Sequence, residues 1–123
     1  MVRSYAELTG DFNPLHFDAD FAAHTQFKRL IAQGGITTGL LHALVAMDMP
    51  GPGSVFVRQE WSFPRPVYIG DTLRARATVK SVRASKGLAK LEFFVVNQRG
   101  EEVLEGQATV YQAEPQRHAA DDE

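Results

Sequence analysis

The sequence contains no cysteine, and this absence removes several kinds of chemistry. Without thiols, the chain forms no disulfide bonds, has no thiol nucleophile and offers no cysteine ligand to a metal ion. The four histidines are scattered, without the close spacing of a metal-binding set. We therefore expect no metal site.

Long hydrophobic runs and an excess of one charge are also missing. No stretch of about 18 apolar residues occurs, and no basic start precedes an apolar segment, so we expect no membrane span, no secretion signal and a cytoplasmic location. The chain carries 13 basic and 15 acidic residues, interspersed, for a net charge of −2. Because no broad cationic face results, we expect no nucleic-acid partner.

What remains fits one compact domain. A chain of 123 residues, 44% of them hydrophobic, can bury a sizeable core. We expect a single domain over residues 1–113. Residues 114–123 are polar and end in three acidic residues, so we expect them to form a flexible tail.

Residues 10–16, Gly-Asp-Phe-Asn-Pro-Leu-His, place a carboxylate five residues from an imidazole. Pro14 cannot continue a helix and pushes Asn13 out of the α region, which predicts a turn or bent loop. In such a loop Asp11 and His16 can converge on one small space, where they can hold a water molecule and move its proton. The structural alternative is that Asp11 caps a turn and His16 is an ordinary packed histidine.

A second feature begins at Gln33, where two glycines precede an apolar stretch over residues 36–47 that predicts a buried helix. Backbone N–H groups at its start, with the positive end of the helix dipole, can receive the negative charge that develops on a thioester oxygen. Gly34 and Gly35 would let a ligand approach closely, although a plain helix entry could use the same residues.

These motifs resemble those of the MaoC-like, (R)-specific enoyl-CoA hydratases. The resemblance runs from Tyr5 to Tyr111 and includes the 18-residue gap from His16 to Gly34 and a later segment, Phe-Pro-Arg-Pro-Val-Tyr-Ile-Gly-Asp, over residues 63–71. It implies an α+β hot-dog fold, in which a curved antiparallel sheet wraps around a long central helix. It also implies that Asp11 and His16 are the catalytic pair and that the Gly34 N–H is the oxyanion donor.

The resemblance further implies a homodimer, with an acyl tunnel near the contact between the subunits. For Leu41 and Val45 a core role is an equal alternative, and His42 could be a satisfied buried histidine. The residues expected to bind substrate are Asn13, Gly35, Thr38, Leu41, His42 and Val45.

The chain departs from the family pattern in two ways. Members usually carry His before the helix-opening glycine, whereas this chain carries Gln33, an amide that cannot titrate. Members also tend to have an extra strand ahead of the helix that leads to the motif, whereas ten residues precede Asp11.

Local patterns predict the remaining elements. A capping box at Ser4 predicts the start of a short helix, and Asp18 is expected to cap a helix over residues 19–24. Strands are expected after the Pro/Gly-rich residues 49–53, with turns at 83–87 and 97–100. Because the long helix is apolar on most sides, we expect it to be enclosed. The positions expected to share an inward face are Val55, Val57, Trp61 and Phe63, then Leu73, Ala75, Ala77 and Val79, then Leu91, Phe93 and Val95, then Leu104, Gly106, Ala108 and Val110.

We therefore predict a lyase that adds water to a trans-2-enoyl thioester of coenzyme A or acyl carrier protein, giving the (R)-3-hydroxyacyl thioester without a cofactor. Two alternatives stay open. One is an acyl-CoA thioesterase of the hot-dog fold, in which a carboxylate directs water at the carbonyl carbon. The other is a noncatalytic subunit that binds an acyl thioester or a partner.

Overall fold

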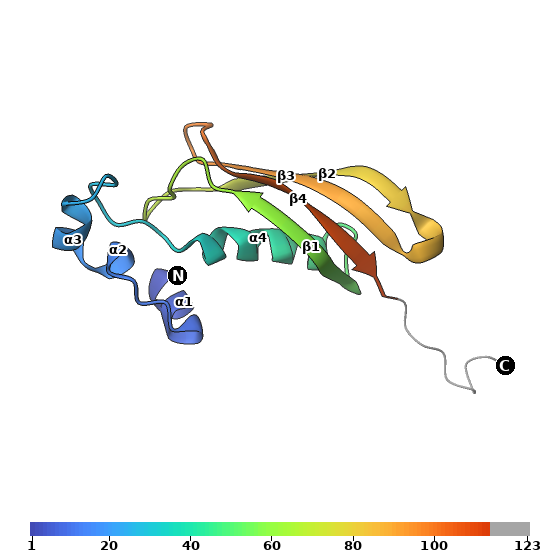
Figure 1. The fold of residues 1–123 in the computed structure, drawn as a ribbon, viewed down its shortest axis with the longest axis horizontal. Coiled ribbons are helices and arrows are strands. Elements are labelled where there is room, and N and C mark those ends of the chain that lie inside the picture. The colour runs from blue at the N-terminus through green and yellow to red at the C-terminus, as the bar shows by residue number, and fades with distance from the viewer. Residues whose placement is uncertain (114–123) are drawn as a thin grey trace.

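The computed structural model describes residues 1–113. Their four α-helices precede their strands (Figure 1). The predicted tail, residues 114–123, lies outside the described residues. The elements are α1 (Val2–Thr9), α2 (Pro14–Phe17), α3 (Ala19–Ala23), α4 (Gly34–Met47), β1 (Ser54–Ser62), β2 (Arg74–Arg83), the short 3-10 helix η1 (Ala84–Lys86), β3 (Leu88–Val96) and β4 (Glu102–Gln112).

The strands form one antiparallel sheet in the order β1-β4-β3-β2. The sheet is curved, and α4 runs along its inner side, while α1, α2 and α3 gather beyond the first turn of α4 (Figure 1). The expected α+β hot-dog fold is confirmed. Its consequence for function is that the 10–16 motif and the start of α4 lie at the same end of the molecule.

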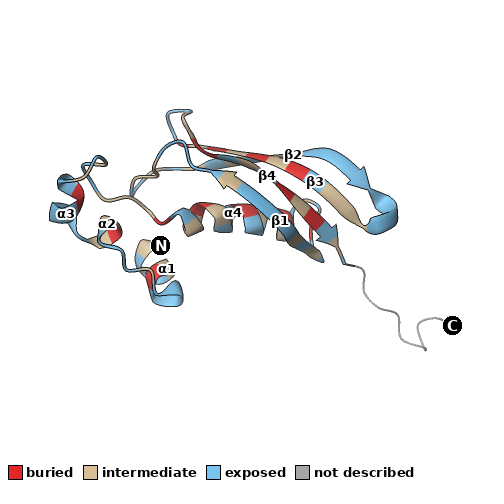
Figure 2. Ribbon diagram, in the orientation of Figure 1, coloured by how far each residue is buried: buried red, intermediate tan, exposed pale blue. Residues whose placement is uncertain are grey.

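Helix α4 meets the sheet through a single stripe. Thr37, Leu41 and Val45 are spaced four residues apart, which places them on one face, and all three are buried (Figure 2). The expectation that this helix is enclosed on most sides is wrong for the single chain, because Leu40 is 39% and Met47 71% exposed. The sheet lies on one side of α4 only and cannot cover the opposite face.

The predicted alternation holds in the central strands, fails in β1 and is wrong for Val79 of β2, which is 43% exposed. The inward positions of β3 and β4 form the core with α4. In β1, a bulge between Phe56 and Arg58 shifts the register, so Phe56 and Trp61 pack on the core while Val55 and Val57 are exposed. The expectation that these two valines share the face of Trp61 is therefore wrong.

The helix caps gave one correct and one wrong prediction. The Asp18 carboxylate accepts a hydrogen bond from the Phe21 N–H at 3.1 Å, so the predicted cap is confirmed, and the helix ends at Ala23. Ser4 caps nothing, because α1 already begins at Val2, and the Tyr5 N–H donates to the Met1 carbonyl at 2.9 Å. The helix therefore begins about one turn earlier than the capping pattern predicts, and Ala6 is its buried residue.

Candidate active site

The 10–16 motif folds as a loop followed by one helical turn. The Asn13 side-chain oxygen accepts from the Leu15 N–H at 3.0 Å, and Pro14 occupies the first position of α2, where its missing N–H costs nothing. The Asn13 N–H in turn donates to Asp11 Oδ1 at 3.3 Å. The bent loop is confirmed up to Asn13, and the structure adds that His16 is carried by a helix.

The imidazole of His16 is buried and held from one side. His16 is 7% exposed, and its Nδ1 lies 2.7 Å from the Ile31 carbonyl oxygen. Because a carbonyl oxygen only accepts, we assign the Nδ1–H as the donor, which leaves Nε2 of the neutral ring with a free lone pair. Nε2 faces the Asp11 carboxylate, with 3.9 Å between Nε2 and Oδ1.

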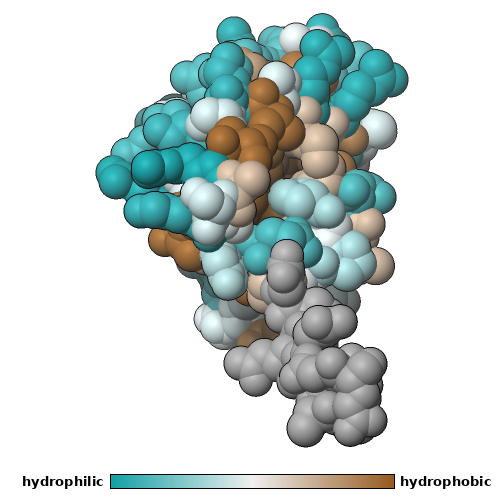
Figure 3. Space-filling view, turned by 90° about the vertical axis from the view of Figure 1, so that its right-hand side faces the viewer, coloured by the Kyte–Doolittle hydropathy of each residue, from teal (hydrophilic) through white to brown (hydrophobic). Residues whose placement is uncertain are grey.

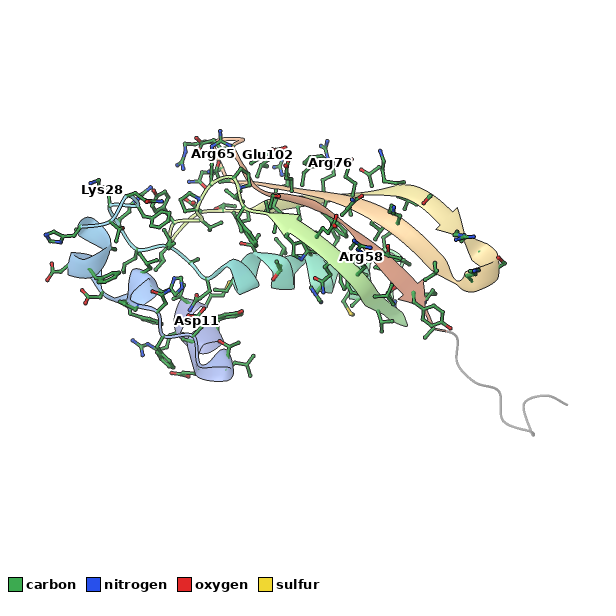
Figure 4. All side chains as sticks on the ribbon, in the orientation of Figure 1. Asp11, Lys28, Arg58, Arg65, Arg76 and Glu102 are labelled. Carbon is green, nitrogen blue, oxygen red and sulfur yellow. The ribbon has the colours of Figure 1, made fainter. Side chains whose placement is uncertain are left out.

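This separation suits a shared water better than a direct bond. It exceeds the 2.7–3.2 Å of a hydrogen bond, whereas two acceptors each about 2.8 Å from one water oxygen lie this far apart when the angle at the oxygen is about 90°. The Asp11 side chain is 42% exposed, so water reaches it. Figure 4 shows Asp11 between α1 and α2, below the first turn of α4. The structure thus brings the predicted pair together.

Gly34 opens α4 at the position that the sequence predicts. Helix geometry gives its N–H no acceptor within the helix, so the group is available to a ligand. Gly34 borders a small cavity of about 220 Å³ together with Phe63 and Arg65. A Cβ at this position would lie 3.4 Å from the Phe63 ring, which is ordinary contact, so packing alone does not demand glycine here. Its role as oxyanion donor stays a prediction.

Gly35 has a clear packing role. A Cβ on this residue would collide with the hydroxyl end of the Tyr5 ring, so the glycine allows α1 to lie against the first turn of α4. The sequence gives no direct signal for this contact, which joins residues that are 30 positions apart. Substrate binding by Gly35 stays a prediction beside this structural reason.

The largest cavity near the pair has a volume of about 700 Å³ and is lined by His16 and mostly apolar side chains. This volume is within the usual range of about 300–1,000 Å³ for small-molecule sites. Its walls come from α1, α2, α4 and the segment before β2, so no sequence pattern marks them as a group. The apolar lining residues include Val2 of α1, Phe17 of α2, Ile36 and Leu40 of α4, and Val67, Ile69 and Leu73 of the segment before β2.

The remaining predicted binding residues line no part of this larger cavity. Leu41 and Val45 belong to the core. The His42 Nε2 lies 3.0 Å from the side-chain oxygen of Gln59, and the Thr38 hydroxyl donates to a backbone carbonyl of the preceding turn at 3.2 Å. Asn13 is used as the cap of α2. Their contact with substrate stays a prediction.

Within residues 1–113, no group of three or more His, Asp or Glu side chains is arranged to hold a metal ion. None of the helices in this range is both long and apolar enough to cross a membrane.

Comparison with known proteins identifies a matching family and several relatives. A family model described as "MaoC like domain" matches residues 1–98. The (R)-specific enoyl-CoA hydratase of Aeromonas caviae is 38% identical over 109 residues, which cover 89% of this chain and 81% of that protein. The enzyme of the same name from Rhodospirillum rubrum is also 38% identical, over 89% of this chain and 75% of its own length. The solved structure of the Aeromonas caviae (R)-hydratase superposes with a TM-score of 0.85, covering 91% of this chain and 85% of that one.

Proposed function

The chain belongs to the family of MaoC-like domains, and we propose that it is an (R)-specific enoyl-CoA hydratase. The reaction is the reversible addition of water to a trans-2-enoyl thioester, which gives the (R)-3-hydroxyacyl thioester. The observation that carries the proposal is the Asp11–His16 pair, whose acceptor atoms lie 3.9 Å apart, with His16 in the wall of an apolar cavity.

The pair would act on one water molecule. Asp11 and the Nε2 of His16 each accept a hydrogen bond from it, which aims a lone pair of its oxygen at the β-carbon of the substrate. As the new C–O bond forms, the pair takes one proton from the water and returns a proton to the α-carbon, so that H and OH are added in balance. Base and acid are assigned to the pair as a unit, because both groups contact the same water molecule. General acid–base groups of this kind supply about 10²–10⁴ in rate.

Gly34 would stabilise the electrons that move onto the thioester oxygen. When water attacks the β-carbon, negative charge develops on this oxygen as the enolate forms. The N–H of Gly34 at the positive end of α4 is a suitable donor, and one such donor is typically worth about 10²–10³ in rate. One water molecule supplies both the hydroxyl group and the hydrogen that are added, so the reaction consumes no cofactor.

The acyl chain would occupy the cavity of about 700 Å³ that His16 opens onto. Ile36 and Leu40 form its wall on α4, and Val67 and Ile69 face them from the segment before β2. Burial of an acyl chain among these side chains would stabilise binding by about 0.8 kcal/mol per methylene.

We also propose a homodimer. Strand β1 is an edge of the sheet, and its Val55 and Val57 are 50% and 57% exposed. Met47, on the uncovered face of α4, is 71% exposed. Apolar edges of this kind are usually covered, and pairing with a second copy is the common solution. Figure 3 looks onto the end of the molecule away from α1 and shows hydrophobic surface bordered by hydrophilic side chains. The cytoplasmic location stays a prediction.

The test is the ultraviolet absorbance of enoyl-CoA thioesters of short, medium and long chains with the purified protein. An (R)-specific and an (S)-specific dehydrogenase, added separately, report the handedness of the product. Loss of enoyl absorbance with (R) product is the expected result. Release of free thiol without hydration would indicate a thioesterase, and no change with any chain length would indicate a noncatalytic subunit.

A further inference from the structure

Gln33 is the residue directly before Gly34, and it is almost fully buried, with 1% of its surface exposed. Its side-chain Nε2 donates two hydrogen bonds to backbone carbonyls, at 3.1 Å to Val2 and at 3.5 Å to Asp11. Its Oε1 is buried, and no N–H or O–H group of residues 1–113 donates to it. This glutamine therefore uses its donors fully and leaves its acceptor without a protein partner.

The two bonds join three parts of the proposed site. Val2 belongs to the first turn of α1 and lines the larger cavity. Asp11 is a member of the catalytic pair, and Gln33 itself leads into the first N–H groups of α4. One amide thus connects the cavity wall, the acidic loop and the helix start.

The other bonds of the acidic loop do not make this connection. The Asp11 N–H donates to the Thr9 hydroxyl at 3.3 Å, and the Asn13 N–H donates to the Asp11 carboxylate at 3.3 Å. Both stay within residues 9–13, so they shape the loop without holding it against α4. The bond to the Asp11 carbonyl, at 3.5 Å, is at the long end of the hydrogen-bond range, and it is the one that links the loop to the residue before α4.

Stability alone does not account for a glutamine at this position. A buried polar atom without a partner lowers stability, and this cost offsets the two hydrogen bonds that the Gln33 amide donates. Residues that act at a functional site often carry this kind of penalty. The amide therefore calls for a reason beyond packing.

We propose that Gln33 is a positioning residue of the hydration site, which fixes the Asp11–His16 pair relative to the Gly34 N–H. Gln33 acts by holding the Asp11 backbone and the first turn of α1 to the start of α4. The inference rests on the proposed function. Gln33 touches no reacting atom, and its effect on the rate passes through Asp11.

The chain offers a matched control at the far end of the molecule. Strand β4 ends on the side of the molecule away from α1 (Figure 1). Gln112, the last residue of β4, donates from Nε2 to the Pro52 carbonyl at 2.6 Å and accepts from the Ser54 hydroxyl at 2.8 Å. Both glutamines thus tie a neighbouring segment through a side-chain amide. Gln33→Met and Gln112→Met remove these ties while keeping side chains of similar length.

The kinetic test compares both variants with the wild type at a temperature well below unfolding. We expect Gln33→Met to lower kcat about 10–100-fold, with KM within about threefold of wild type, because small misplacements of reacting groups cost rates of this size. Its melting temperature should stay close to that of the wild type, because the loss of two hydrogen bonds is offset by removal of the unpartnered oxygen. Gln112→Met should keep its kcat. A Gln33→Met enzyme with wild-type kcat would overturn the proposal, and so would a loss of kcat that disappears once the variant is fully folded at low temperature.

Two further readouts separate positioning from a general structural role. In a double-mutant cycle, Gln33→Met should add little to the loss caused by Asp11→Asn, whereas independent effects would multiply. Amide hydrogen exchange of residues 11–13 should speed up several-fold in Gln33→Met and not in Gln112→Met. Equal exchange in both variants would overturn the proposal, whatever the activity. Absence of hydration by the wild type would instead refute the proposed function.

Discussion

Two glycines of α4, four residues apart, make opposite predictions when each is replaced by alanine. A Cβ at Gly35 would collide with the Tyr5 ring, whereas a Cβ at Gly39 would have no atom within 4 Å. Both positions are helical, so the two substitutions share the change in backbone freedom. The contact with Tyr5 is therefore the main difference between them.

The magnitudes follow from this comparison. Replacing glycine by alanine within a helix stabilises by about 0.5–1 kcal/mol, which is our expectation for Gly39→Ala. Gly35→Ala has the same gain and adds overpacking, which costs about 1–3 kcal/mol. We therefore expect Gly35→Ala to lower the free energy of unfolding by up to about 2.5 kcal/mol.

The assay is thermal unfolding of both variants, followed by circular dichroism, together with enoyl-CoA hydration. Because Gly35→Ala must shift the first turn of α4 or α1, it should also lower kcat, whereas Gly39→Ala should keep it. Tyr5→Leu, which removes the colliding ring, should restore much of the stability in the Gly35→Ala background. If the two alanine variants proved equally stable and equally active, the packing of α1 on α4 described above would be wrong.

Neighbouring leucines on α4 test the cavity and the core separately. Leu40 lines the larger cavity, so Leu40→Trp should lower kcat/KM for medium-chain enoyl-CoA about 10-fold or more relative to crotonyl-CoA. A 10-fold change corresponds to about 1.4 kcal/mol. An unchanged ratio would show that the acyl chain does not occupy this cavity. Leu41 is fully buried against the sheet, so Leu41→Ala should lower the free energy of unfolding, measured with denaturant, by about 2–5 kcal/mol. Its preference for acyl chain length should stay the same. A changed preference would instead show that Leu41 contacts the substrate.

Local sequence patterns predicted the elements whose causes are local. Asp18 caps its helix, and the Asn-Pro step bends the chain ahead of His16, because each depends on a neighbouring backbone group. The start of α4 at Gly34 follows from the change to an apolar segment. The bulge in β1 was not predicted, because it depends on how Phe56 pairs with β4. A pattern in which apolar and polar residues alternate along one strand carries no information about this pairing.

The parts of the site that could not be predicted depend on contacts between distant residues. The collision that keeps residue 35 a glycine involves Tyr5, and the burial of Gln33 depends on the first turn of α1. The same holds for the cavity, because α4 is apolar on several sides and periodicity does not tell which of Leu40 and Leu41 faces the core. Only the placement of α4 on the sheet decides this.

The most direct test of the central claim is the hydration rate of Asp11→Asn, with Asp20→Asn as the control. The amide that replaces the Asp11 carboxylate can still accept from the Asn13 N–H, so the loop keeps its shape while the charge and the basic group are lost. Asp20 is exposed in the first turn of α3 and lines no part of the larger cavity. We expect Asp11→Asn to lose about 10²–10⁴ of the rate with an unchanged melting temperature, and Asp20→Asn to keep wild-type activity. An Asp11→Asn enzyme that retains more than a few per cent of the rate would contradict the assignment of the catalytic pair.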